Sequence, residues 1–238
     1  MISISGQSPF GKRSMNGYVH SMPRRYELKE RAEQQAETRR RIVEAVVALH
    51  REVGPAQTTI SAIAVRAGVE RLTVYRHFAD ETALFAACSA HFAAEVPPPD
   101  PATWIGESDP VRRLRATLTA FYGYYQRGED MLAHIMRDAP KNPALAAALA
   151  PWLTFVAMTR DGLLEGWGER EPRSLLVAAV THALRFETWQ SLAQDAELGN
   201  ENAVELMIAL AAATGTMVKA ELTPTAESVE RNRPSTQV

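Results

Sequence analysis

The chain of 238 residues has a single cysteine, Cys88, which excludes a disulfide framework and any zinc site built on two or more cysteines. No uninterrupted apolar run approaches the ~20 residues of a membrane span. The first 26 residues lack the compact apolar core and the small-residue cleavage site of a secretory signal. These absences predict a soluble cytoplasmic protein with no membrane partner.

Sequence patterns of several catalytic sites are also missing, because the chain has no glycine-rich phosphate loop and no Gly-x-Ser-x-Gly elbow. Cys88 lies one helical turn from His91, but no third group is present to orient such a thiol–imidazole pair. His134 and Asp138 share a helix face, and two such residues alone are more often a solvated face than a metal site. The sequence therefore predicts no catalytic residue, no cofactor and no metal.

Charge is unevenly distributed along the chain, although the net charge is only −2. Residues 1–79 carry 13 basic and 7 acidic side chains, a net charge of +6, whereas the remainder carries a net charge of −8. A basic head on an acidic body favours a polyanionic partner for the head alone. A solvated helix face is the commoner origin of a charge cluster, so charge by itself does not identify nucleic acid.

Apolar residues recur with a helical period along most of the chain, and no alternating segment exceeds four residues. A first amphipathic helix should end before Gly54 and Pro55, and its apolar stripe consists of Ile42, Val46, Leu49 and Val53. The prolines of residues 96–101 cannot continue a helix and predict a short extended connector. Further helices are expected at about 111–125, 130–137, 143–167 with a kink or interruption at Pro151, 173–194 and 201–222. The predicted fold class is all-α.

Residues 59–78 have the pattern of two short helices joined by a tight turn. Thr59 suits the N-cap of the first helix, and Gly68 permits the left-handed conformation that ends it. Residues that point inward from the two helices are Ile60, Ile63, Ala64, Ala67, Val69, Val74 and Phe78. The second helix presents a polar and basic face that consists of Arg71, Thr73, Tyr75, Arg76 and His77. Such a pair is a helix-turn-helix.

This segment closely resembles the DNA-binding segment of tetracycline-repressor (TetR) family regulators. The residues that carry the resemblance are Thr59, Ile63, Ala64, Ala67, Gly68, Val69, Thr73, Val74, Tyr75, His77 and Phe78, followed by Leu84 and Phe85. The rest of the chain matches only in helix content and length. The resemblance implies a three-helix DNA-binding domain followed by a helical domain for effector binding and dimerisation.

The resemblance also assigns contacts with double-stranded DNA. Thr59, Tyr75 and His77 would contact phosphates, whereas Arg71 and Thr73 would face base edges, with Arg71 suited to bidentate contact with guanine. Arg76 belongs to the same face. The basic residues Arg39, Arg40 and Arg41 would add backbone contacts, although an ordinary solvated face explains these three equally well.

Three positions depart from the family pattern. Glu70 replaces the usual Ser or Thr cap and would either accept a hydrogen bond from cytosine N4 or repel phosphate. Leu72 replaces a small residue and is suited to a thymine methyl group, and Glu81 replaces a frequent lysine. DNA binding is therefore expected, but the operator sequence is not predictable.

Aromatic and methionine side chains after the proline run predict an apolar cavity for a small-molecule effector, although a packed core is the more ordinary role for any one of them. The predicted lining consists of Phe121, Tyr122, Tyr125, Met131, Trp152, Phe155, Met158, His182, Phe186 and Trp189. His182 and Arg185 are candidates to orient a polar group of the ligand. Alternatively, Arg185 pairs with a neighbouring acid at the surface.

The last two long helices predict a homodimer, because residues 203–218 are apolar on more than one face and rich in small residues. A two-fold four-helix bundle would separate the recognition helices by one DNA turn, ~34–36 Å, to read a palindrome.

The predicted organisation is an arm at 1–25, a helix-turn-helix domain at 26–80, a connecting helix at 81–95, an effector and dimerisation domain at 96–223 and a tail at 224–238. We expect a nucleoid-associated repressor whose ligand shifts residues 81–94. The alternative is an all-α small-molecule-binding protein whose helix-turn-helix has lost operator recognition.

Overall fold

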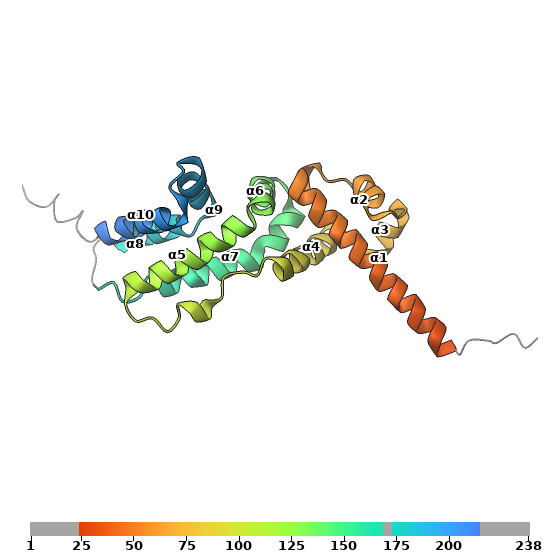
Figure 1. Cartoon of the computed structure of the whole chain (residues 1–238), viewed down its shortest axis with the longest axis horizontal. Helices are drawn as coiled ribbons and strands as arrows, with labels where there is room; N and C mark the ends of the chain where they lie inside the picture. The colour runs from red at the N-terminus through yellow and green to blue at the C-terminus, as the bar shows by residue number, and fades with distance from the viewer. Residues whose placement is uncertain (1–23, 169–172, 215–238) are drawn as a thin grey trace, which may run out of the picture. The chain divides into compact units, whose positions relative to one another are not determined.

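The computed structural model describes residues 24–168 and 173–214, and its secondary structure over these residues is entirely helical (Figure 1), which confirms the predicted fold class. The longer helices are α1 (Arg24–Glu52), α2 (Ile60–Ala67), α3 (Arg71–His77), α4 (Glu81–Glu95), α5 (Pro110–Arg127), α6 (Glu129–Asp138), α7 (Pro143–Leu163), α8 (Arg173–Ala183) and α10 (Gly199–Ala213). Short turns are η1 (Pro55–Gln57), η2 (Pro101–Thr103), η3 (Ala139–Lys141), α9 (Phe186–Trp189) and the π-helical η4 (Gln190–Asp195). The predicted tail and most of the predicted arm lie outside the described residues.

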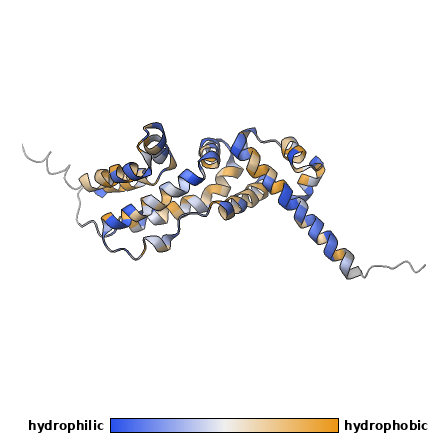
Figure 2. Ribbon diagram, in the orientation of Figure 1, coloured by the Kyte–Doolittle hydropathy of each residue, from blue (hydrophilic) through white to orange (hydrophobic). Residues whose placement is uncertain are grey.

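The chain divides into two compact units, residues 1–38 and residues 39–238. In the first unit the described residues form the charged N-terminal part of α1, coloured mostly hydrophilic in Figure 2, and Lys29 pairs with Glu33 at 3.7 Å. Helix α1 begins at Arg24, so the expected arm of residues 1–25 is wrong for its last two residues.

The second unit contains the core. Ile42 and Val46 of α1 are fully buried with Ile63 of α2 and Val74 of α3, as the helical stripe predicts. Val53 is 37% exposed instead, because α1 ends at Glu52 and Gly54 turns the chain with a φ of +88°. The expected stop at Gly54 and Pro55 is confirmed.

The body packs its helices around α5 and α7. Helix α10 packs on α5, and α4 packs on α7. Residues 97–100 form the non-helical connector that the prolines predict, and Pro101 begins the short turn η2. In Figure 2, α4 and α7 are coloured towards the hydrophobic end of the scale along most of their lengths. Helix α7 runs without a break through the exposed Pro151, so of the two expected effects the interruption is wrong, and the kink stays a prediction.

The helix expected at 173–194 is broken after Ala183, which corrects the sequence-based prediction. The hydroxyl of Tyr122 donates to the carbonyl of Ala183 at 3.0 Å, and that of Tyr125 donates to the carbonyl of Leu184 at 2.6 Å. These hydroxyls satisfy two carbonyls at the end of α8, so the chain can leave the helix there. Helix α7 ends at Leu163 rather than at Trp167, whose indole Nε1 donates to the Leu163 carbonyl at 2.8 Å.

Candidate nucleic-acid interface and ligand groove

The helix-turn-helix is built from short-range capping interactions that the sequence predicts. The hydroxyl of Thr59 accepts a hydrogen bond from the Ala62 amide at 3.1 Å and begins α2. Gly68 has a φ of +63° and ends α2 in the left-handed conformation. Val74 is 1% exposed and Phe78 is 3% exposed, so the apolar face of α3 is buried as expected.

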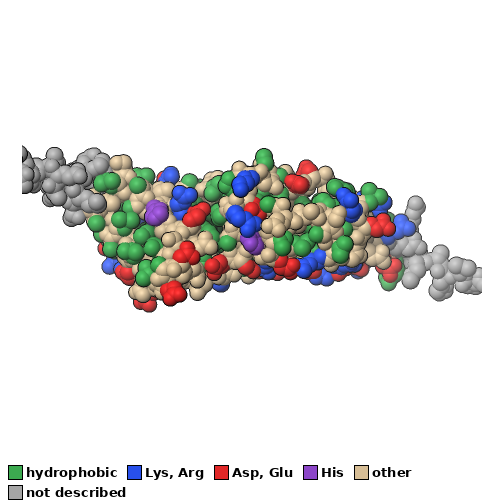
Figure 3. All heavy atoms as spheres, turned by 90° about the horizontal axis from the view of Figure 1, so that it is seen from above, with side chains coloured by type: hydrophobic (Ala, Val, Ile, Leu, Met, Phe, Trp, Pro, Cys, Tyr) green, Lys and Arg blue, Asp and Glu red, His purple; other side chains and the backbone are tan. Residues whose placement is uncertain are grey.

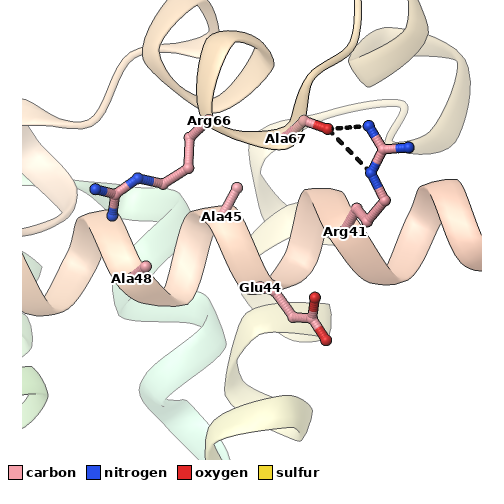
Figure 4. Close-up of a pocket in the computed structure, with 6 residues that line it drawn as sticks. All are labelled: Arg41, Glu44, Ala45, Ala48, Arg66 and Ala67. Carbon is pink, nitrogen blue, oxygen red and sulfur yellow. Dashed lines mark hydrogen bonds between the residues drawn. The ribbon is translucent and has the colours of Figure 1, made fainter.

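Two arginines of α1 hold the backbone of this motif. Arg41 points towards the Ala67 carbonyl and donates to it through Nε at 3.1 Å (Figure 4). In the same view α2 passes over Ala45 and Ala48 of α1. A second donor of Arg41 reaches the carbonyl of Gly68 at 3.0 Å. These bonds satisfy carbonyls at the C-terminus of α2 and fix the turn.

Arg39 holds the other end of the motif. Its guanidinium donates to the His77 carbonyl at 2.7 Å and lies 4.2 Å from the centre of the Phe78 ring. Arg40 pairs with Glu44 at 2.6 Å on the exposed side of α1. Arg39, Arg40 and Arg41 therefore all have contacts within the protein, and their contact with DNA stays a prediction.

The outward face of α3 is largely open to solvent. Leu72 is 56% exposed and Tyr75 is 52% exposed, and Arg71 and Arg76 are also exposed. Thr73 and His77 are half-buried on the same short helix. Helix α3 therefore carries Arg71, Thr73, Tyr75 and His77 together, whereas Thr59 lies at the start of α2.

Two acidic side chains flank this face. Glu70 occupies the N-cap position of α3, but its side chain makes no capping hydrogen bond and is exposed. This agrees with the expectation that a glutamate forfeits the usual cap. Glu81 is exposed in the first turn of α4, where Asp80 supplies the cap by accepting from the Ala83 amide at 2.8 Å.

An apolar groove of about 600 Å³ lies between α4, the proline connector, α6 and α7. Helix α4 contributes small side chains, Ala86, Ser89, Ala90 and Ala93, and this choice of residues leaves the space open. The other lining residues are Phe92, Pro98, Pro99, Pro101, Tyr124, Met131, Leu132, Ile135, Ala148, Leu149, Pro151, Trp152 and Phe155. None of the lining side chains is charged, so the groove suits an apolar ligand.

A second cavity of about 360 Å³ shares Pro101 and Phe155 with this groove. It includes Met158, which is 70% exposed, and Arg113. Arg113 donates to the backbone carbonyls of Glu107, at 3.2 Å, and of Glu165.

The predicted ligand residues fall into four groups in the structure, the last of which is His182 alone. Met131, Trp152 and Phe155 line the groove, and Met158 lines the second cavity. Five others line neither cavity, because they pack against one another in the buried core, and these are Phe121, Tyr122, Tyr125, Phe186 and Trp189. For these five, the structure favours the core role that the sequence left open.

His182 belongs to a smaller cavity of about 250 Å³ together with Arg185, and this cavity shares no lining residue with the groove or the second cavity. Its ring Nδ1 lies 3.2 Å from the Thr188 hydroxyl. Arg185 pairs with Glu187 at 3.4 Å, which is the surface pairing that the sequence left as the alternative.

The α4 side of the groove was missed by sequence reasoning. Alanine and serine give no chemical signal, and their significance depends on the large side chains of α7 that face them across the groove. Tyr124, which belongs to the aromatic and methionine cluster that predicts the cavity, also lines the groove, and its ring centre is 5.0 Å from that of Trp152.

Cys88 contacts a different histidine from the one that its sequence spacing suggests. Its Sγ lies 3.5 Å from Nδ1 of the buried His50, whereas His91 Nε2 lies 3.2 Å from Glu95. Burial raises the pKa of the Cys88 thiol to about 12 and lowers that of His50 to about 4. Within residues 24–168 and 173–214, no three metal-ligating side chains are grouped to hold an ion.

No single helix of the described segments has both the length and the hydropathy of a membrane span. Residues 129–141 and 143–163 reach that threshold only as a pair, and they are bent by 120° relative to each other.

Sequence and structure comparisons give a consistent result. Residues 42–88 match the family model described as bacterial regulatory proteins, tetR family. No curated protein is significantly similar in sequence to the chain.

Solved structures share the fold of this chain. A TetR-like transcriptional regulator from Rhodococcus sp. RHA1 is 22% identical with a TM-score of 0.54, and the match covers 74% of this chain and 94% of that chain. A TetR family transcription regulator from Marinobacter aquaeolei VT8 is 18% identical with a TM-score of 0.52 and coverage of 77% and 97%. A TetR transcription regulator from Haloarcula marismortui ATCC 43049 is 18% identical with a TM-score of 0.51 and coverage of 76% and 97%. The resemblance is confirmed: residues 42–88 match the tetR family model, and the chain shares the fold of solved structures described as TetR-family transcriptional regulators.

Proposed function

We propose that the chain is a transcriptional regulator that binds a palindromic DNA operator as a homodimer and acts as a repressor. The observation that carries this proposal is the exposed polar and basic face of α3, held in place by Arg39 and Arg41. A short helix with this face, carried on a capped partner helix, fits the major groove of B-DNA. Such a regulator acts in the cytoplasm at the nucleoid and performs no catalysis.

Each side chain of the face has a proposed contact. Arg71 and Thr73, near the N-terminus of α3, face base edges, and Leu72 is suited to a thymine methyl group. Tyr75 and His77 bind phosphates, together with Thr59 at the start of α2. Arg39 and Arg40, in the part of α1 beside the motif, add contacts with the DNA backbone.

The homodimer forms through α8 and α10. Leu175 is 37% exposed, and Leu206 and Leu210 of α10 are 45% and 40% exposed, an exposure that a partner subunit would remove. Figure 3 shows hydrophobic side chains gathered on its left part, at the end where Figure 1 places α8 and α10. Residues 215–222, expected to extend the last helix, lie outside the described residues.

A small apolar or aromatic ligand in the groove releases the repressor from DNA. Helix α4 supplies one wall of the groove, and only three residues separate it from α3, so a ligand that displaces α4 changes the position of α3. The ligand shifts the equilibrium only by its preference for the released arrangement, typically ~1–3 kcal/mol.

A second candidate is a small-molecule-binding protein whose helix-turn-helix no longer recognises an operator. The exposed carboxylates of Glu70 and Glu81 favour it, because both would lie close to the phosphates of a bound duplex. The two candidates differ in how strongly salt weakens DNA binding.

The test is the affinity for duplex DNA measured at several salt concentrations. The regulator should show a steep log–log slope, about −0.9 for each phosphate contact with a basic side chain. A flat slope with micromolar or weaker affinity at every salt concentration would contradict the regulator and support the second candidate.

A further inference from the structure

We propose that Asp138 is a positioning residue that transmits ligand binding in the groove to the helix-turn-helix through the turn between α1 and α2. This inference rests on the proposed function, because it names the residue that couples its two binding sites. Helix α6 carries Asp138 at its last position and contributes to the groove through residues of its preceding turns.

Asp138 is a buried charge that holds the backbone of the turn. It is 5% exposed, and its Oδ2 accepts a hydrogen bond from the Ala56 amide at 2.9 Å. Arg137 binds both carboxylate oxygens, at 2.8 and 3.1 Å, and lowers the pKa of Asp138, with the Ala56 amide as a further cause. An ionised acceptor forms a stronger hydrogen bond to an amide than a neutral one does.

The turn is shaped to receive this pair of side chains. Gly54 has a φ of +88°, and a Cβ atom there would lie 2.4 Å from Arg137 Nη2 and 3.0 Å from Asp138 Oδ2. Arg137 also donates to the Val53 carbonyl at 3.4 Å. A larger residue here would be strained by the positive φ and would displace the Arg137 guanidinium. The chain then passes through η1 to Thr59, where α2 begins.

The same helix holds the last turns of α1. His134 Nδ1 donates to the backbone carbonyl of His50 at 2.8 Å, one turn of α6 before Asp138. Helix α6 therefore contacts the backbone of His50 near the end of α1 and the backbone of Ala56 in η1.

The adjacent face of α6 lines the groove. Met131, Leu132 and Ile135 contribute to the lining, and they alternate in sequence with the residues that hold the turn. A helix of ten residues moves as a rigid body, so a ligand that displaces these side chains moves the Asp138 carboxylate and pulls the Ala56 amide with it. This route is separate from the direct displacement of α4.

Another contact between α1 and α6 is less suited to this task. Arg51 lies 3.5 Å from Asp130, but the Asp130 side chain is 56% exposed. Exposed ion pairs contribute little energy and are screened by salt. A buried carboxylate bound to a backbone amide restricts the chain more strongly.

The experiment uses a tethered aromatic group as the probe in the groove. The exposed Ala90→Cys variant is labelled with N-(1-naphthyl)maleimide, and the native Cys88 thiol does not compete because it is buried with a raised pKa. Affinity for a duplex selected by the protein is compared before and after labelling. The same comparison is made with Asp138→Ala added, with Asp138→Asn added, and with Asp161→Ala added as a control.

Asp161 is the matched control because it also pairs with the preceding arginine, at 2.6 Å, but it is exposed on α7. Labelling should weaken DNA binding about 10-fold or more with Asp138 intact, and less than about 3-fold with Asp138→Ala, within the usual range of allosteric coupling. Asp161→Ala should keep the full effect. Asp138→Asn should keep most of it, because an amide oxygen still accepts from Ala56.

Two results would overturn the inference. An equal loss of affinity with and without Asp138→Ala would contradict it while leaving the proposed function intact. No loss on labelling the parent Ala90→Cys protein would contradict the proposed ligand release and the inference together.

A second measurement covers the case in which Asp138→Ala does not fold. Hydrogen exchange of the Ala56 amide in the Ala90→Cys protein should accelerate on labelling, because the acceptor of that amide is displaced. An unchanged exchange rate would also overturn the inference.

Discussion

Helix α3 and the groove between α4, α6 and α7 differ in how sequence determines their surfaces. In α3 each outward residue is polar, basic or an isolated large apolar side chain, and its neighbours in sequence fix where it points. In the groove, the lining residues are of the same types as the core residues beside them. Phe121 and Phe155 illustrate this, because their rings stack with centres 5.8 Å apart, yet only Phe155 lines the groove. A short motif therefore reveals a polar interface, whereas a cavity depends on long-range packing.

The strongest test of this comparison is the substitution of the two stacked phenylalanines. Phe121 is fully buried, so Phe121→Ala should destabilise the fold by about 3–5 kcal/mol. Phe155 is half-buried, so Phe155→Ala should destabilise it by about 1–2 kcal/mol. Urea unfolding of both variants checks the prediction, and equal losses would mean that the groove closes into the core in solution.

Acid should destabilise the fold at the buried contact between His50 of α1 and Cys88 of α4. Burial lowers the pKa of His50 from 6.5 to about 4, with His134 adding to this effect and Asp138 opposing it. The unfolded chain binds this proton more readily, so the stability contributed by neutral His50 is complete above pH 6.5 and is lost as the pH falls towards 4. Between pH 7.5 and 4.5 the loss should be about 2–3 kcal/mol.

Urea unfolding at both pH values, with and without His50→Gln, measures this contribution. The variant should lose correspondingly less stability on acidification. His91→Gln is the control, because His91 is half-buried on α4 and should leave the acid sensitivity largely in place. An identical response of His50→Gln and the parent protein would contradict a neutral buried imidazole.

At the DNA interface, Arg71→Ala should mainly change sequence preference. A bidentate contact with guanine contributes about 1–3 kcal/mol of discrimination at one base pair, so that position of the operator should become degenerate. Binding to a panel of single-base operator variants would measure the effect. If the preferred sequence stays the same, Arg71 does not read a base.

A smaller and more uniform effect is expected for Tyr75→Phe. The lost hydroxyl removes one phosphate hydrogen bond, about 0.5–1.5 kcal/mol, from every sequence alike. The ratio of specific to non-specific affinity should therefore stay constant. A change in that ratio would mean that Tyr75 contacts a base rather than the backbone.

The sequence was sufficient to predict the helix-turn-helix, because the caps, turn and burial of residues 59–78 depend on neighbours a few positions away. It did not predict the break after Ala183, which depends on hydroxyls of Tyr122 and Tyr125 that lie about 60 positions earlier in the chain. Nor did it predict that α4 lines the groove, because an alanine gives no sequence signal of its own. Its role depends on the large side chains, such as Trp152, across the groove. The contact of Asp138 with Ala56 joins residues 82 positions apart, so local sequence patterns could not predict it either.

The central claim is that α3 reads DNA in a dimer, and the most direct test is selection of bound duplexes from a random library at ~0.15 M salt, where non-specific affinity is weak. The account predicts enrichment of a palindrome with half-sites one helical turn apart, about 10 base pairs from centre to centre. Failure to enrich any sequence, by protein purified free of bound small molecules, would contradict the claim.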